Sequence, residues 1–78
     1  MRESILEALK RVNEDVDFES SEDFVEDGLL DSFDIVTLVE ELEDEFGVEI
    51  SGTDIVPENF VNVDSIEALI LKCREENE

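Results

Sequence analysis

The chain has 78 residues, which is enough for one small domain with a modest hydrophobic core and too few for a multidomain enzyme. Its 25 acidic residues against five basic ones give a net charge of −20 without any histidine, so neither nucleic acids nor anionic membranes are expected as partners. Because 28 residues are Leu, Ile, Val or Phe, we nevertheless expect the acidic chain to fold, as a single domain over residues 1–78.

The first 31 residues predict one helix and then a long loop. Ser4 and Glu7 are in capping-box register at the start of the helix. Its apolar stripe has spacings of three and four and consists of Ile5, Ala8, Leu9, Val12 and Val16. The pattern is lost from about Asp15 to Asp31, and so long a loop is expected to contain a short turn of helix and to be pinned to the core by its own apolar side chains. These side chains are Val16, Phe18, Phe24 and Val25.

Two further helices are predicted in the middle of the chain. The first is the best marked and runs from about Ser32 to Phe46, with Asp31 as its N-cap and Gly47 as the residue that ends it. The second is short: Pro57 suits a first helical turn, because its missing N–H would have no partner there, and the helix is expected to end near Phe60.

The last predicted helix has Asp64 and Glu67 in capping-box register. Its apolar stripe, at i, i+3, i+4 and i+7, consists of Ile66, Leu69, Ile70 and Cys73. The alternation at Val48 and Ile50 is too brief for a strand, so no sheet is expected. The predicted fold class is therefore all-α: a small four-helix bundle of three main helices and a short third helix, with a long first loop.

Membrane, redox and catalytic signals are absent from the sequence. No apolar run approaches the roughly 20 residues of a bilayer-spanning helix, and acids stand where a signal peptide would be apolar, so a cytoplasmic protein without membrane insertion is expected. Cys73 has no second cysteine and no histidine to join it in a disulfide or zinc site, so it is interpreted as a packing residue. Without histidine, paired cysteines or a glycine-rich phosphate loop, independent catalysis is not expected.

The acids from Asp15 to Glu19 alternate as they do in an EF-hand calcium loop. Ser20 stands where that loop requires glycine, and two long flanking helices are missing, so no metal site is predicted.

One side of the helix over 32–46 combines apolar and acidic residues. At 100° per residue, Phe33 and Val36 fall outside the core stripe and lie beside Ser32 among carboxylates. Two interpretations remain open: an exposed apolar spot ringed by acids that docks a basic partner, or apolar residues that loops cover while the acids solvate the helix. Ser32 on its own is typical of a helix start.

The segments Gly28–Val36 (GLLDSFDIV) and Leu38–Ile50 (LVEELEDEFGVEI) resemble the acyl carrier protein family. The resemblance extends over nearly the whole chain, through its length, acidity, long first loop, short third helix and the start of the last helix at 63–66. It implies a non-catalytic carrier whose Ser32 receives a covalent 4′-phosphopantetheine arm from coenzyme A through a separate phosphopantetheinyl transferase. The thiol of that arm would then hold cargo as a thioester. The N–H groups at a helix start favour a nearby phosphodiester.

The resemblance also implies a monomeric carrier with a partner-binding face, because in the family acids of the second helix meet basic patches on successive enzymes. Asp31 would support Ser32 as a cap and contact partners. The other implied partner contacts are Phe33, Asp34, Val36, Glu40, Glu43 and Asp44, with Phe60 of the short helix as a further one.

Three departures from the family pattern leave the cargo and the partner enzymes open. Phe33 replaces the usual leucine after the serine, Thr37 stands where fatty-acid carriers often have an acid, and Glu40 stands where an apolar residue is common. The cargo could come from a fatty-acid or polyketide-type synthase. The GLLDS segment also looks like carriers loaded by a dedicated adenylating ligase, such as the D-alanyl carrier of teichoic-acid modification. An unmodified acidic interaction module is the alternative from another functional class.

Overall fold

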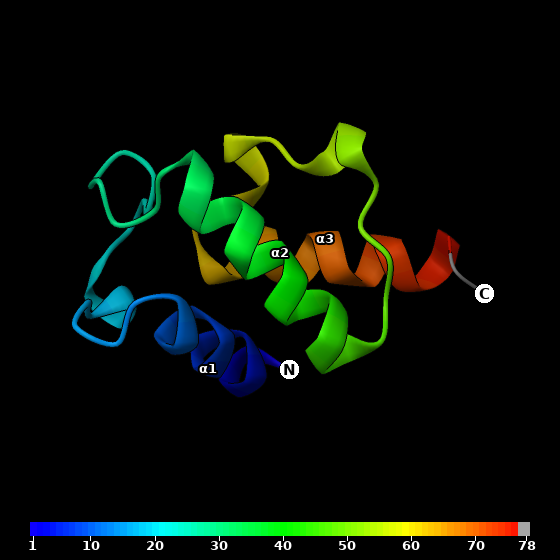
Figure 1. Cartoon of the computed structure of the whole chain (residues 1–78), viewed down its shortest axis with the longest axis horizontal. Coiled ribbons are helices and arrows are strands. Elements are labelled where there is room, and N and C mark those ends of the chain that lie inside the picture. Colours follow the sequence, from blue (N-terminus) through cyan, green and yellow to red (C-terminus); the bar gives the residue numbers. More distant parts are fainter. Residues whose placement is uncertain (77–78) are drawn as a thin grey trace.

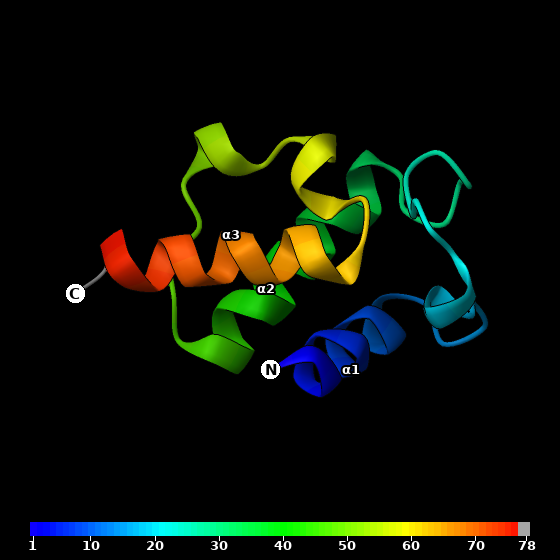
Figure 2. The same ribbon diagram turned by 180° about the vertical axis from the view of Figure 1, so that it is seen from behind.

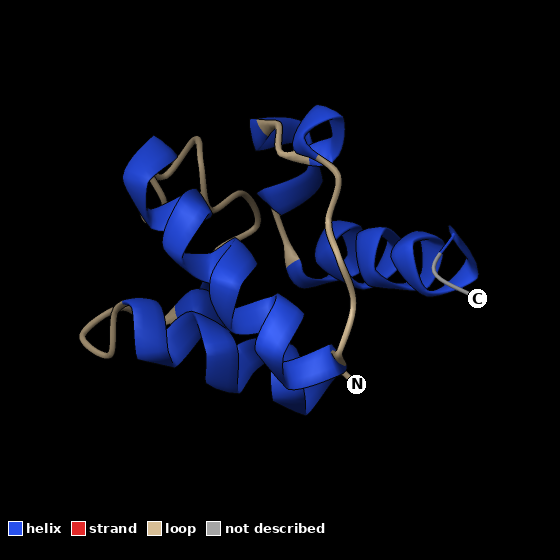
Figure 3. Ribbon diagram, turned by 45° about the vertical axis from the view of Figure 1, so that its right-hand side comes forward, coloured by secondary structure: helices blue, strands red, loops and turns tan. Residues whose placement is uncertain are grey.

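The computed structural model describes residues 1–76 and is helical without strands over that range (Figure 3). Its frame consists of α1 (Arg2–Val12), α2 (Ser32–Phe46) and α3 (Val63–Glu76). The connections contain the short 3₁₀ helices η1 (Phe18–Ser20), η2 (Gly52–Asp54) and η3 (Pro57–Phe60). The predicted all-α fold with a long first loop is confirmed, and η3 is the predicted short helix. The turn η2 was not predicted.

The three α-helices surround one hydrophobic core. In Figure 1 α2 crosses in front of α3, Figure 2 shows the reverse side, and α1 packs against both of the other helices. The stripes predicted from periodicity are buried in one cluster. Its helical members are Ile5, Ala8 and Leu9 of α1, Ile35, Leu38, Val39 and Leu42 of α2, and Ile66, Leu69, Ile70 and Cys73 of α3. Val12 and Phe46 are half-buried at its edge. Val16, which the periodicity added to the first stripe, lies beyond the end of α1 at Val12 and packs half-buried against the core from the first loop.

The loop between α1 and α2 is held down by its aromatic residues, as predicted. Phe18 and Phe24 are buried, and their rings meet edge to face with centroids 5.2 Å apart. The Phe24 N–H donates to the carbonyl oxygen of Val61 over 2.7 Å. This bond joins the first loop to the segment immediately before α3.

The start of α1 differs from the prediction. The helix begins at Arg2 with Met1 as its N-cap, and the Ile5 N–H donates to the Met1 carbonyl oxygen over 3.1 Å. Ser4 therefore lies inside the first turn, and the predicted Ser4–Glu7 capping box is wrong. The backbone of Met1 supplies the first acceptor one turn earlier than that box requires.

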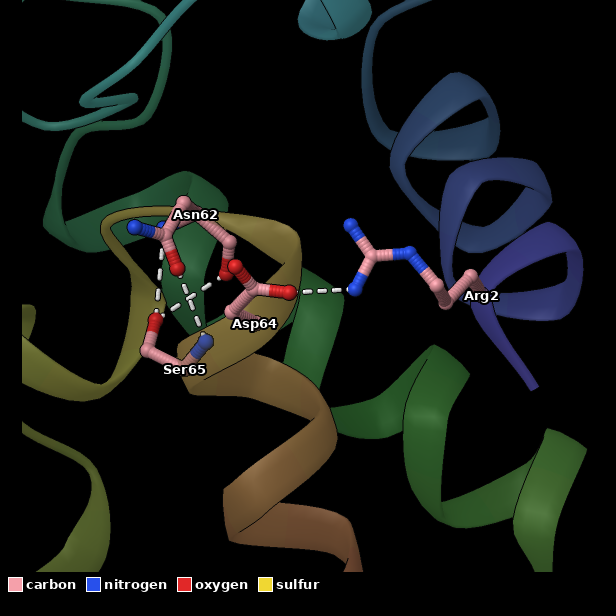
Figure 4. A network of polar contacts seen from close by, with 4 residues as sticks. All are labelled: Arg2, Asn62, Asp64 and Ser65. Carbon is pink, nitrogen blue, oxygen red and sulfur yellow. Dashed lines mark hydrogen bonds and ion pairs between the residues drawn. The ribbon is translucent and has the colours of Figure 1, made fainter.

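The start of α3 is capped by a pair of residues that periodicity did not indicate (Figure 4). The Asn62 Oδ1 accepts from the Ser65 N–H over 2.8 Å, and the Asn62 N–H donates to the Ser65 hydroxyl over 3.2 Å. The helix starts at Val63, so Asp64 is already helical and the predicted Asp64–Glu67 box is wrong. Asp64 instead pairs with Arg2 and ties the start of α1 to the start of α3.

The structure also corrects the expectation that Phe60 contacts partners. Its side chain is fully buried at the end of η3, so it packs in the core and presents no surface to a partner. An aromatic ring in a one-turn helix on so small a domain is drawn into the core by the apolar area it removes from water. Within residues 1–76, no helix combines the length and apolarity that crossing a membrane requires.

Candidate functional site

The chain is fixed in place shortly before α2 begins. The carbonyl oxygen of Phe24 accepts from the N–H groups of Leu29 and Leu30, over 2.8 and 3.1 Å. The Leu30 side chain is buried in the core. Ser32 follows two residues later, so its position is set by a buried anchor and by the backbone of the first loop.

The turn that leads to this anchor depends on a left-handed glycine. Gly28 has φ +75°, and its N–H donates to the Val25 carbonyl oxygen over 3.1 Å. The Asp23 carboxylate stabilises the same turn by accepting from the N–H groups of Val25 and Glu26, over 3.1 and 2.9 Å. A Cβ at Gly28 would meet no atom within 4 Å, so the requirement for glycine is conformational and not steric.

Asp31 caps α2, as predicted, within a reciprocal capping box. Its Oδ1 accepts from the Asp34 N–H over 2.8 Å, and the Asp34 Oδ2 accepts from the Asp31 N–H over 3.4 Å. Both carboxylates thus lie at the positive end of the helix dipole, where negative charge is stabilised. The box holds the backbone on either side of Ser32.

Ser32 is the first residue of α2 and is exposed. Within residues 1–76, the Ser32 hydroxyl makes no side-chain hydrogen bond. The N–H groups of Ser32 and Phe33 belong to the first turn and have no acceptor inside the helix. A phosphate ester on Ser32 therefore fits this position: the hydroxyl is accessible, and unpaired N–H groups lie beside it to bind phosphate oxygens.

An exposed row of side chains continues from Ser32 along α2. Phe33 is 78% exposed and Val36 is 54% exposed, which excludes the interpretation that loops cover them. Glu40 and Asp44 are also exposed and follow at successive spacings of four, so they lie on the same side of the helix. We call Phe33, Val36, Glu40 and Asp44 the α2 row.

Two other acids predicted to contact partners are engaged within the domain. Asp34 is half-buried and belongs to the capping box. Glu43 is half-buried, and its Oε2 accepts from the Ile50 N–H over 2.9 Å. No sequence signal could have revealed this contact, because it joins a helix to an extended segment seven residues later.

Two arginines contact residues of α2 that lie outside the α2 row. Arg11 pairs with Glu41 and Glu45, over 3.0 and 3.6 Å, and the hydrogen bond to Glu41 raises the pKa of its guanidinium. Arg74 lies over the ring of Phe46, 5.5 Å from the centroid. Over the described residues 1–76, neither Glu40 nor Asp44 of the row takes part in an ion pair, so the row keeps its negative charge.

The thiol of Cys73 is not part of this site. It is buried in α3, and burial raises its pKa, to which the carboxylates of Asp54 and Glu76 add. A raised pKa keeps the thiol protonated and unreactive at neutral pH. The observed burial confirms the prediction that Cys73 is a packing residue.

The chain matches a known protein family over most of its length. Residues 1–70 match the model of the family described as "Phosphopantetheine attachment site". The match includes α1, the first loop, all of α2 with its exposed serine, and the first part of α3. No curated protein and no solved structure was found to match the chain.

Proposed function

Because the chain belongs to the phosphopantetheine attachment site family, which carries 4′-phosphopantetheine covalently, we propose that it is an acyl carrier protein with Ser32 as the attachment residue. The observation that supports this assignment is the exposed Ser32 hydroxyl at the start of α2, two residues after the buried Leu30 and within the Asp31–Asp34 capping box. The alternative is an unmodified acidic interaction module, whose function would not depend on the Ser32 hydroxyl.

In the proposed modification, Ser32 Oγ forms a phosphoester bond to the group delivered from coenzyme A, and 3′,5′-ADP leaves. The chain has no histidine to act as a general base, so the hydroxyl proton is proposed to pass to a base of the transferase. Asp31 keeps the serine at the helix start, and the N–H groups of Ser32 and Phe33 stabilise the phosphate oxygens. The bound arm supplies a terminal thiol that holds cargo as a thioester, and the chain acts as a carrier without catalysis of its own.

The α2 row is the proposed docking face for the transferase and for the enzymes that load and unload the carrier. Phe33 and Val36 offer apolar contact next to Ser32, and Glu40 and Asp44 offer negative charge further along the helix. A partner with a basic patch around an apolar contact complements this face. Such electrostatic docking speeds association more than it tightens binding, which suits a carrier that visits several enzymes.

The cargo is proposed to be an acyl group, with an aminoacyl group loaded by an adenylating ligase as the alternative. Phe33 and Glu40, which depart from the fatty-acid-carrier pattern, are exposed in the α2 row where partners would touch them. Thr37 turns back onto the helix and donates to the Phe33 carbonyl oxygen over 3.2 Å. These positions favour dedicated partner enzymes over a housekeeping fatty-acid synthase.

A labelling experiment tests the attachment residue. The purified chain is incubated with a fluorescent coenzyme A analogue, magnesium and a broad-specificity phosphopantetheinyl transferase. We expect the wild type to be labelled and Ser32→Ala to stay unlabelled. Ser51→Ala is the matched control, because Ser51 is another exposed serine that precedes a helical turn, and it should be labelled normally. Labelling of folded Ser32→Ala would show that the attachment residue is a different one.

A further inference from the structure

The segment that leaves α2 lies along the core as a short strap, residues 48–51. It is extended, and its side chains alternate between the core and solvent. Val48 and Ile50 are buried at 6% and 7% exposure, and Glu49 between them is exposed. The strap therefore covers part of the core with two apolar side chains.

The strap and the turn η2 that follows it are each tied to an α-helix by a charged side chain. On the α2 side, the carboxylate of Glu43 accepts from the Ile50 N–H over 2.9 Å. On the α3 side, Lys72 pairs with Asp54 of η2 over 2.8 Å. A hydrogen bond to a charged acceptor is stronger than one between neutral groups, so the Glu43 bond is a substantial restraint on the strap.

Glu43 also lies where a docked partner can reach it. It directly precedes Asp44 of the α2 row, and it borders an open hollow of about 400 Å³. The hollow is also lined by Glu49, Ile50, Ser51 and Glu76. The Glu43 carboxylate thus has room to turn outward toward a cationic side chain.

We propose that Glu43 is a positioning residue that latches the strap onto α2, and that pairing with a cationic side chain of a docked partner releases the latch. A guanidinium that binds bidentately engages both carboxylate oxygens and weakens their capacity to accept from the Ile50 N–H. The strap then opens locally, because Val48 and Ile50 are left with packing as their main restraint. The release by a partner rests on the proposed function, whereas the latch itself does not.

Hydrogen exchange of the Ile50 amide, followed by NMR on the whole chain, tests the latch. Glu43→Ala removes the acceptor and should speed this exchange at least about tenfold. Glu43→Gln loses the same charge but keeps an acceptor oxygen, so its effect should be clearly smaller. Asp44→Ala, the neighbouring exposed acid, should leave the Ile50 amide unchanged. Unchanged exchange in folded Glu43→Ala would overturn the latch.

The same amide tests release by a partner. A broad-specificity phosphopantetheinyl transferase with magnesium but without coenzyme A is added to saturation, with the Phe33 amide shift as the sign of docking. We expect faster Ile50 exchange in the wild type and no further change in Glu43→Gln, which cannot form the ion pair. Unchanged or slower Ile50 exchange in the docked wild type contradicts release. If the transferase neither docks nor labels Ser32, the proposed function is contradicted. The latch is then tested by the exchange in Glu43→Ala alone.

Discussion

The N–H of Phe24 donates a 2.7 Å hydrogen bond to the carbonyl oxygen of Val61, so two segments nearly 40 residues apart meet beside the start of α2. The carbonyl oxygen of the same Phe24 accepts from Leu30, two residues before Ser32. The position of the exposed serine thus depends on the first loop and on the segment before α3, as well as on α2 itself.

The turn at Gly28 should be sensitive to any side chain. Gly28→Ala forces an L residue into the left-handed region and should lower the free energy of unfolding by about 1 to 2 kcal/mol. Gly52→Ala is the matched control, because Gly52 is also free of contacts within 4 Å but does not have a positive φ. Urea denaturation of both variants checks the prediction, and equal stability of the two would contradict it.

Asp31 and Ser32 are neighbours, but we expect the first to stabilise the fold by capping α2 and the second to serve as the attachment residue. Asp31→Ala removes the side chain that accepts from the Asp34 N–H and should cost about 1 kcal/mol of stability. Ser32→Ala should change stability by less than about 0.5 kcal/mol, because the hydroxyl is exposed and makes no cap. Thermal denaturation of the two variants gives the comparison; a larger loss in Ser32→Ala than in Asp31→Ala would show that the serine is structural.

The boundaries of α2 and the buried stripes were predicted correctly from the sequence, whereas the caps of α1 and α3 were not. The boundaries of α2 were predictable because Asp31 and Gly47 act on their own turns, and the buried stripes followed from the helical period. The capping boxes predicted at Ser4 and Asp64 failed because Met1 and Asn62 supply earlier caps that fit the same turns. Local patterns did not distinguish between these alternatives.

Only the tertiary structure shows which of the predicted partner contacts are exposed. Periodicity placed Phe33 off the core stripe but left open whether a loop covered it, and only the path of the first loop shows that it is exposed. Glu43 lies on the acidic side of the helix, yet its carboxylate bonds to Ile50. Phe60 was assigned to the surface by analogy with the family, whereas its packing places it in the core.

Charge reversal tests the negative part of the α2 row. Asp44→Lys should lower kcat/KM of the transferase about tenfold or more at low salt, because it opposes a basic docking patch. The salt dependence of that rate should weaken as well. Glu14→Lys makes the same charge change at an exposed position after α1, outside the row, and should have little effect. Equal losses in the two variants would indicate a response to net charge alone.

The apolar part of the row should affect docking without affecting the fold. Phe33→Ala removes a side chain that is 78% exposed, so the melting temperature should stay within a few degrees of the wild type. The KM of the transferase for this variant should rise several-fold, because the apolar contact next to Ser32 is lost. Steady-state kinetics check the change, and an unaltered KM would remove Phe33 from the docking face.

Burial of Cys73 predicts a specific pH dependence. Its thiol pKa is raised by burial and by nearby carboxylates, so the folded state holds the proton more tightly than the unfolded state. The resulting stability is fully present below the unfolded pKa of about 8.5 and is lost as the pH rises toward the folded pKa. Melting temperature measured from pH 7 to 10 should therefore fall more steeply in the wild type than in Cys73→Ala. Parallel curves would contradict the raised pKa.

The proposal that Ser32 carries the arm is tested most directly by the intact mass of the chain before and after incubation with coenzyme A, magnesium and a broad-specificity phosphopantetheinyl transferase. We predict a gain of one phosphopantetheine in the wild type and no gain in Ser32→Ala. An unchanged mass in both proteins, with the wild type folded, would contradict the carrier function and leave an acidic interaction module in its place.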